Sequence, residues 1–395
     1  MALSASQPDH PGGADSKESR EYNRLHRRMA VADFILGLFL MGLLLATGWT
    51  STLRDWAYQA SGQRYALAVF LYVALLTLAG KLFGLPLDYY GFRIEHRYEL
   101  SNQNASSWFF DQAKSWIIGL LLATIVVELV YRAIRLSPEW WWILAWAVFV
   151  ILAVVFAQIA PVVLFPLFYK FEPLENDELR QRLLRLTERA GTRVRGVYEW
   201  KLSAKSKKAN AALTGLGRTR RIILSDTLLE NYSAEEIEAV LAHELGHHVH
   251  KHVPRGIAVQ MVVTFFGFWL TASVLRYSVQ ELRWFESLSD FANLPLLALL
   301  STLISFLLLP GLNAYSRHNE RQADMFCFRS IPTVVPFISS MDKLAEQNLS
   351  ERYPSRFVEL FFHSHPAISR RIAAARAFAA AHPLPPGTES NPSKP

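Results

Sequence analysis

The sequence predicts a mainly α-helical, polytopic membrane protein, with about six transmembrane helices and an α+β domain on one side of the membrane. Three observations lead to this fold class. Six apolar windows are long enough, or nearly so, to cross a bilayer, which takes about 20 mostly apolar residues. One long polar stretch separates the fourth window from the fifth. Basic residues gather beside the windows, where the positive-inside rule expects them.

The apolar windows carry almost no charge. Lys81 is the one charged residue in the second window, Glu128 is the one in the third, and the other four have none. A core helix of a soluble protein seldom runs this long without a charge, so we interpret all six as membrane spans. They cover residues 34–53, 65–87, 115–131, 140–169, 256–275 and 291–316.

The spans divide the chain. The expected parts are a disordered N-terminus (1–28), four spans (29–170), a first polar part (171–254), two further spans (255–316), a second polar part (317–382) and a disordered tail (383–395). A cytoplasmic N-terminus would place every lysine except Lys81 on the cytoplasmic side. The net charge of +7 then reflects membrane orientation, so we expect no nucleic-acid partner. The single cysteine, Cys327, excludes a disulfide within this chain and a cysteine-based zinc site.

The first polar part has the pattern of a small α+β domain. Leu179, Leu183 and Leu186 mark one face of a short helix. Three strands are expected next, at 197–203, 210–216 and 221–225. Ser233 and Glu236 form an S-x-x-E capping box, which predicts a helix beginning at about Ala234.

That helix contains His243-Glu244-Leu245-Gly246-His247. Two imidazoles one helical turn apart can bind one ion, and the glutamate between them can take a proton from a water on that ion. We therefore predict a zinc site with His243 and His247 as ligands and Glu244 as catalytic base.

A third ligand is expected after the sixth span. Glu320 and Asp324 are one helical turn apart, so Glu320 could bind the ion while Asp324 accepts the second N–H of a ligand histidine. The alternative is a solvated helix face on which Glu320 pairs with an arginine. Both polar parts of the chain are expected on the same side of the membrane, which favours Glu320 as a metal ligand. His248, His250 and His252 could extend a metal-rich patch, but they lack a glutamate between them and are interpreted as a basic turn at the membrane interface. His363 and His365 alone would indicate a polar loop.

Together these motifs resemble the type I CAAX prenyl endoprotease family, membrane-embedded zinc metalloproteases related to the heat-shock membrane protease HtpX. The resemblance covers about residues 85–382. Besides His243–His247, it rests on Leu85-Pro86-Leu87-Asp88-Tyr89-Tyr90, Phe165-Pro166-Leu167-Phe168-Tyr169, Lys208-Ala209-Asn210-Ala211, residues 221–229, residues 316–324 and Ser364-His365-Pro366.

The resemblance implies a helical barrel around an intramembrane chamber, closed at its cytoplasmic end by a gluzincin-type zinc domain. It assigns zinc to His243, His247 and Glu320. Asn210, beside Ala211, matches the residue that binds substrate backbone on an edge strand, and His365 matches a histidine that steadies the oxyanion. The implied activity is cleavage near the C-terminus of a lipidated or membrane-delivered peptide.

Two further readings stay open. An HtpX-like protease would act on misfolded membrane proteins, and a transporter or scaffold would carry a decayed zinc site, against which the intact ligand set argues. Six spans and the lack of an endoplasmic-reticulum retrieval signal favour a bacterial inner membrane, with the endoplasmic reticulum expected for a eukaryotic source. The partners expected are a peptide or protein, prenylated or not, and membrane lipid.

Overall fold

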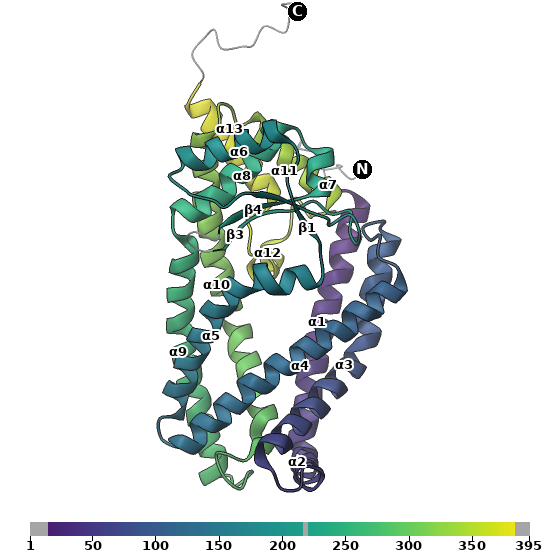
Figure 1. The fold of residues 1–395 in the computed structure, drawn as a ribbon, viewed down its shortest axis with the longest axis vertical. Helices are drawn as coiled ribbons and strands as arrows, with labels where there is room; N and C mark the ends of the chain where they lie inside the picture. The colour runs from purple at the N-terminus through teal and green to yellow at the C-terminus, as the bar shows by residue number, and fades with distance from the viewer. Residues whose placement is uncertain (1–14, 216–219, 384–395) are drawn as a thin grey trace, which may run out of the picture.

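The structure is a computed structural model that describes residues 15–215 and 220–383. Long helices form one end of the molecule, and short helices with a small sheet form the other (Figure 1). α1 begins at the end that holds the sheet. The predicted fold class, mainly α-helical and polytopic with a small α+β domain, is confirmed.

Within the described residues, six helices are long and apolar enough to cross a membrane, as predicted. Most run beyond the predicted windows, because the helical backbone continues into polar sequence. α2 (Trp49–Ala60), between the first two, has only 12 residues. The six are α1 (Lys17–Thr47), α3 (Tyr65–Arg97), α4 (Ala105–Leu136), α5 (Trp141–Ile159) with the two turns that extend it to Leu167, α9 (His252–Gln280) and α10 (Leu294–Ser330) with the short turn Phe291–Asn293 before it.

The predicted disorder of residues 1–28 is wrong from Lys17 onward. Ser16 caps α1 by accepting a hydrogen bond from the Ser19 backbone N–H. The first turns are then held by contacts far away in the sequence: Arg27 pairs with Glu351 at 2.6 Å. The polar composition of a segment does not show such tertiary contacts, so it could not predict that this segment is ordered. Residues 1–14, and residues 384–395 of the predicted tail, lie outside the described residues.

The fourth predicted span, 140–169, is not one uniform helix. α5 ends at Ile159, and a π turn (Ala160–Leu164) and a 3₁₀ turn (Phe165–Leu167) follow. Pro161 and Pro166 lie in these turns and have no backbone N–H to donate, which ends the regular α-helical ladder.

Among the described residues, the sheet has four strands in the order β1-β2-β4-β3. β2 (Val197–Trp200) and β4 (Arg221–Ser225) are parallel, while β1 (Phe171–Pro173) and β3 (Ala211–Thr214) flank them in antiparallel pairing. The three predicted strands are present, although β2 and β3 are shorter than expected and Leu216 lies outside the described residues. β1 was not predicted, because three residues are too few to show a period. β3 forms an edge of the sheet, because it pairs with β4 on one side and with no described strand of the sheet on the other.

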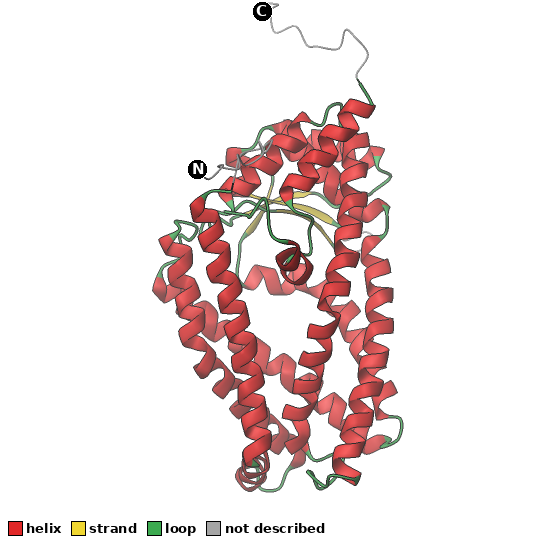
Figure 2. Ribbon diagram, turned by 180° about the vertical axis from the view of Figure 1, so that it is seen from behind, coloured by secondary structure: helices red, strands yellow, loops and turns green. Residues whose placement is uncertain are grey.

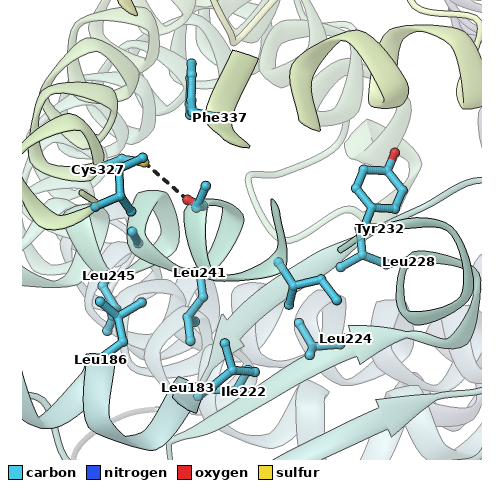
Figure 3. Packing of buried hydrophobic residues seen from close by; sticks show 14 of the residues in the cluster. Leu183, Leu186, Ile222, Leu224, Leu228, Tyr232, Leu241, Leu245, Cys327 and Phe337 are labelled. Atoms are coloured by element: carbon cyan, nitrogen blue, oxygen red, sulfur yellow. Dashed lines mark hydrogen bonds between the residues drawn. The ribbon is translucent and has the colours of Figure 1, made fainter. Parts of the chain in front are cut away.

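Helices cover the face of the sheet that points away from the spans (Figure 2). α6 (Asp177–Arg189) and α8 (Ala234–Val249) lie over the strands, and Leu183, Ile222 and Leu241 are buried between them (Figure 3). Cys327 of α10 is fully buried in the same core and donates to the Ala239 carbonyl at 3.2 Å. The remaining helices of this domain are α7 (Asp226–Asn231), α11 (Val335–Gln347), α12 (Arg356–Phe362) and α13 (Ile368–Ala381).

A second core joins the spans. It includes Tyr72, Tyr131, Trp141 and Phe291, all buried. Beside it lies a cavity of about 410 Å³, lined by side chains of α4, α5, α9 and α10. The helices therefore leave space between them as well as packing against one another.

Candidate metal centre

α8 starts at Ala234, where the sequence predicts. The Ser233 hydroxyl accepts from the Glu236 N–H and the Glu236 carboxylate accepts from the Ser233 N–H, which is the predicted capping box. Its apolar face, with Leu241 and Leu245, is buried in the domain core, and this fixes which way the adjacent face points. His243 and His247 lie on that adjacent face, one turn apart.

α10 approaches α8 very closely at Gly246. A Cβ atom on this glycine would lie 2.8 Å from the Cα and 2.9 Å from the carbonyl oxygen of Ala323. Only a residue without a side chain allows this contact. Because Ala323 lies between Glu320 and Asp324 on α10, the contact brings both acidic residues to the histidines.

Three ligand atoms converge at this crossing. The Nε2 atoms of His243 and His247 are 3.2 Å apart, and each lies 3.2–3.3 Å from a Glu320 carboxylate oxygen. Suitable atoms of the three residues all lie within 4.8 Å of one another. Glu320 is 4% exposed, and its Oε2 atom is buried without accepting a hydrogen bond. A buried, unsatisfied oxygen facing two imidazole nitrogens fits a bound cation, so these residues could hold a metal ion.

His243 is held from behind by Asp324. Its Nδ1 lies 2.8 Å from Asp324 Oδ1, and Arg371 of α13 donates to both oxygens of that carboxylate, at 2.6 and 2.9 Å. Burial and the Arg371 guanidinium lower the pKa of His243, but the nearby carboxylates of Asp324 and Glu320 outweigh both and raise it to about 9. Asp324 therefore lies where the sequence predicts. The sequence analysis did not predict a role for Arg371, because nothing in the sequence around it apart from its charge indicated a partner at the site.

His247 is held from behind by His252. The two Nδ1 atoms are 3.0 Å apart, and His252 Nε2 lies 2.9 Å from Gln322 Oε1. The interpretation of His252 as part of a basic interfacial turn is wrong, because its side chain is buried and faces His247. Its five-residue separation from His247 gave no helical signal, since α8 ends at Val249 and His252 belongs to α9.

Glu244 and His365 flank the three ligand residues. Glu244 and His365 both line two cavities, one of about 820 Å³ and one of about 480 Å³. His365 belongs to the loop between α12 and α13, and its Nε2 lies 3.2 Å from Glu320 Oε1. Its side chain is 61% exposed, with Nδ1 at 3.0 Å from the Ser364 hydroxyl. The structure thus brings His365 to the ligand residues.

Asn210 and Ala211 lie at the start of the edge strand. The Asn210 backbone is fixed to Ser225: its N–H donates to the Ser225 hydroxyl and its carbonyl accepts from the Ser225 N–H. Its side chain stays exposed. Both residues line the 480 Å³ cavity together with Glu244 and His365.

The chain matches known proteins along most of its length. Residues 173–379 match the model of peptidase family M48, and residues 12–170 match a model described as CAAX prenyl protease N-terminal, five membrane helices. Helices α1–α5 fall in the latter range. The metalloprotease YhfN of Bacillus subtilis is 33% identical over 90% of this chain and 84% of its own.

CAAX prenyl protease 1 of Saccharomyces cerevisiae is 27% identical, over 77% of this chain and 71% of its own, and the human homolog is 26% identical over 82% and 77%. The crystal structure of Ste24p from S. mikatae superposes with a TM-score of 0.81 at 22% identity, covering 93% of this chain and 92% of that one. With the fold and the His-His-Glu group, these matches establish that the chain belongs to peptidase family M48, as a membrane-embedded metalloendopeptidase of the CAAX prenyl protease type.

Proposed function

We propose that this protein is a zinc endopeptidase in which His243, His247 and Glu320 bind the metal and Glu244 is the catalytic base. The observation that carries the proposal is the buried Glu320 Oε2, which accepts no hydrogen bond and lies 3.2 Å from His243 Nε2. Two imidazoles and one carboxylate, with room for a water, are a common catalytic zinc set. When bound, zinc polarises the scissile carbonyl and makes its water acidic at neutral pH.

The other residues act on the water and the peptide. Glu244 accepts the proton of the attacking water and returns it to the leaving amine, so that one carboxylate serves both halves of the reaction. His365 donates a hydrogen bond to the oxyanion that forms on the carbonyl. The substrate adds to β3 as a further strand, with its backbone bonded at Asn210 and Ala211, since β3 is an edge of the sheet.

We propose that the substrates are lipidated or membrane-delivered peptides and that the enzyme cuts them near their C-terminus. Relatives named CAAX prenyl protease support a lipidated substrate. Purified enzyme in detergent should cut a farnesylated peptide faster than its unmodified twin. Equal rates on both, with cleavage of unfolded membrane proteins, would favour the HtpX-like quality-control function instead.

The metal and the base can be tested separately. Glu244→Gln should keep zinc but lose nearly all turnover, because glutamine cannot accept the proton of the water. His247→Ala should lose both zinc and turnover. If purified Glu244→Gln cleaved peptides at the wild-type rate, the mechanism would be refuted. Mass spectrometry of the purified protein identifies the bound metal ion.

We also propose that the site faces the cytoplasm, in a bacterial inner membrane or, for a eukaryotic source, in the endoplasmic reticulum, with lipid around the spans and no nucleic-acid partner. Lysines beside the spans support this orientation. The chain has three N-x-S sequons, all on the proposed cytoplasmic side: Asn104, Asn231 and Asn348. Expression in a eukaryotic host should leave all three unglycosylated, and a glycan on any of them would overturn the orientation.

A further inference from the structure

The two histidines of the metal centre have different supports. His243 bonds to a carboxylate, Asp324, that is itself paired with Arg371. His247 has no carboxylate behind it in the described part of the chain, and its Nδ1 lies 3.0 Å from another imidazole, that of His252. The support of the second ligand is therefore an imidazole, and the position of its proton decides the direction of the hydrogen bond.

That direction follows from the role of His247 as a metal ligand. His247 turns Nε2 toward His243 and Glu320, so this nitrogen must be unprotonated to bind a cation. The ring proton of neutral His247 is then on Nδ1 and is donated to His252 Nδ1. His252 can accept it only as the tautomer with its own proton on Nε2. The other tautomer would place two N–H groups against each other at 3.0 Å.

Gln322 selects the same tautomer from the other side. Its Oε1 is 2.9 Å from His252 Nε2, and a carbonyl oxygen can only accept a hydrogen bond. The opposite end of the amide, Nε2, donates to His318 Nε2 at 3.0 Å. All three hydrogen bonds therefore run in one direction, from His247 through His252 and Gln322 to His318, and each has a single compatible assignment.

The backbone is arranged to deliver His252 to this position. α8 ends at Val249, and Lys251 adopts a left-handed conformation with φ of 55° although it is not glycine. This conformation is unfavourable for a residue with a side chain. His252 is the first residue of α9 and is buried beside His247, while α10 supplies Gln322.

We propose that His252 is a positioning residue for the metal ligand His247, kept in its accepting tautomer by Gln322. The proposal rests on the zinc centre proposed above. His252 accepts the Nδ1–H of His247. This hydrogen bond orients the His247 ring and makes His247 Nε2 a better electron-pair donor to the metal. Partners of this kind typically change metal affinity about 10–100-fold when they are removed.

Zinc affinity of the purified full-length protein in detergent, measured by competition with a chelator, tests this without relying on activity. His252→Leu should weaken zinc binding about 10–100-fold. His252→Asn should restore most of the affinity, because the asparagine carbonyl lies about where Nδ1 lies and still accepts from His247. Val253→Ala, a change of an exposed side chain next to His252, is the matched control and should bind zinc as the wild type does. An unchanged affinity in His252→Leu, or an asparagine variant as weak as leucine, would overturn the proposal.

A pair of variants at Gln322 tests the tautomer independently of folding effects at His252. Gln322→Glu can still accept from His252 Nε2 and should keep zinc affinity, whereas Gln322→Leu should weaken it. Equal affinities for these two variants contradict the role of Gln322. The cobalt-substituted protein adds a spectroscopic readout, since a rotated His247 ring changes the visible absorption of Co²⁺. Failure of the wild type to cut any peptide would count against the proposed protease function but would leave these affinity differences intact.

Discussion

Gly246 offers the most stringent test of how the metal centre is assembled. It is the point where α8 and α10 meet, and Gly246→Ala would place a methyl group 2.8 Å from the Cα of Ala323. Ordinary contact begins at 3.4 Å, so the two helices would have to separate by about 0.6 Å. The obstructing atoms are backbone and cannot rotate away.

This displacement is large on the scale of a metal site, where ligand distances hold to about 0.2 Å. Glu320 is three residues before Ala323 and moves with it, away from His243 and His247. We expect zinc affinity to fall at least about 10-fold. Overpacking costs about 1–3 kcal/mol, which the better helix propensity of alanine offsets by about 1 kcal/mol, so the melting temperature should fall only slightly.

Chelator competition and thermal unfolding of the same preparation measure both effects. Gly256→Ala is the matched control, because a Cβ there meets nothing within 4 Å. It should leave zinc affinity unchanged and stabilise α9 if it has any effect. A Gly246→Ala variant with wild-type zinc affinity would refute the reasoning, since it would mean that α8 and α10 can separate without moving Glu320.

Three further predictions concern residues around the metal. His365→Ala should bind zinc normally but cleave at least tens of times more slowly in turnover, while His363→Ala should be nearly silent; equal rates for both would remove His365 from the site. Asp324→Ala should weaken zinc binding about 10–100-fold by chelator competition, because His243 loses its acceptor and Arg371 is left buried without its carboxylate; an unchanged affinity contradicts this role. The pKa of His243 is raised to about 9 from 6.5 in the metal-free protein, so a proton must leave before zinc binds. Zinc affinity should therefore rise with pH up to about 9 and then level off, and a titration without this rise would show that His243 is not protonated at neutral pH.

The sequence by itself determined the features that depend on neighbouring residues. A span needs about 20 apolar residues in a row, so all six were readable, and the capping box fixed the start of the helix that carries His243 and His247. Glu320 and Asp324 could be paired from their one-turn spacing. What the sequence could not give was the distance between these acids and the histidines, because it depends on how α8 crosses α10 at Gly246.

Tertiary structure alone decided the supports of the site and the order of its surroundings. Arg371 reaches Asp324 across 47 residues, and Gln322 reaches His252 across 70. Arg27 reaches Glu351 across 324 residues, and such contacts order a segment that its polar composition predicted to be disordered. Local patterns report hydrogen bonds and faces within one helix or strand. Contacts between distant segments arise only when the hydrophobic cores have fixed where each helix lies, and a single sequence does not show that arrangement.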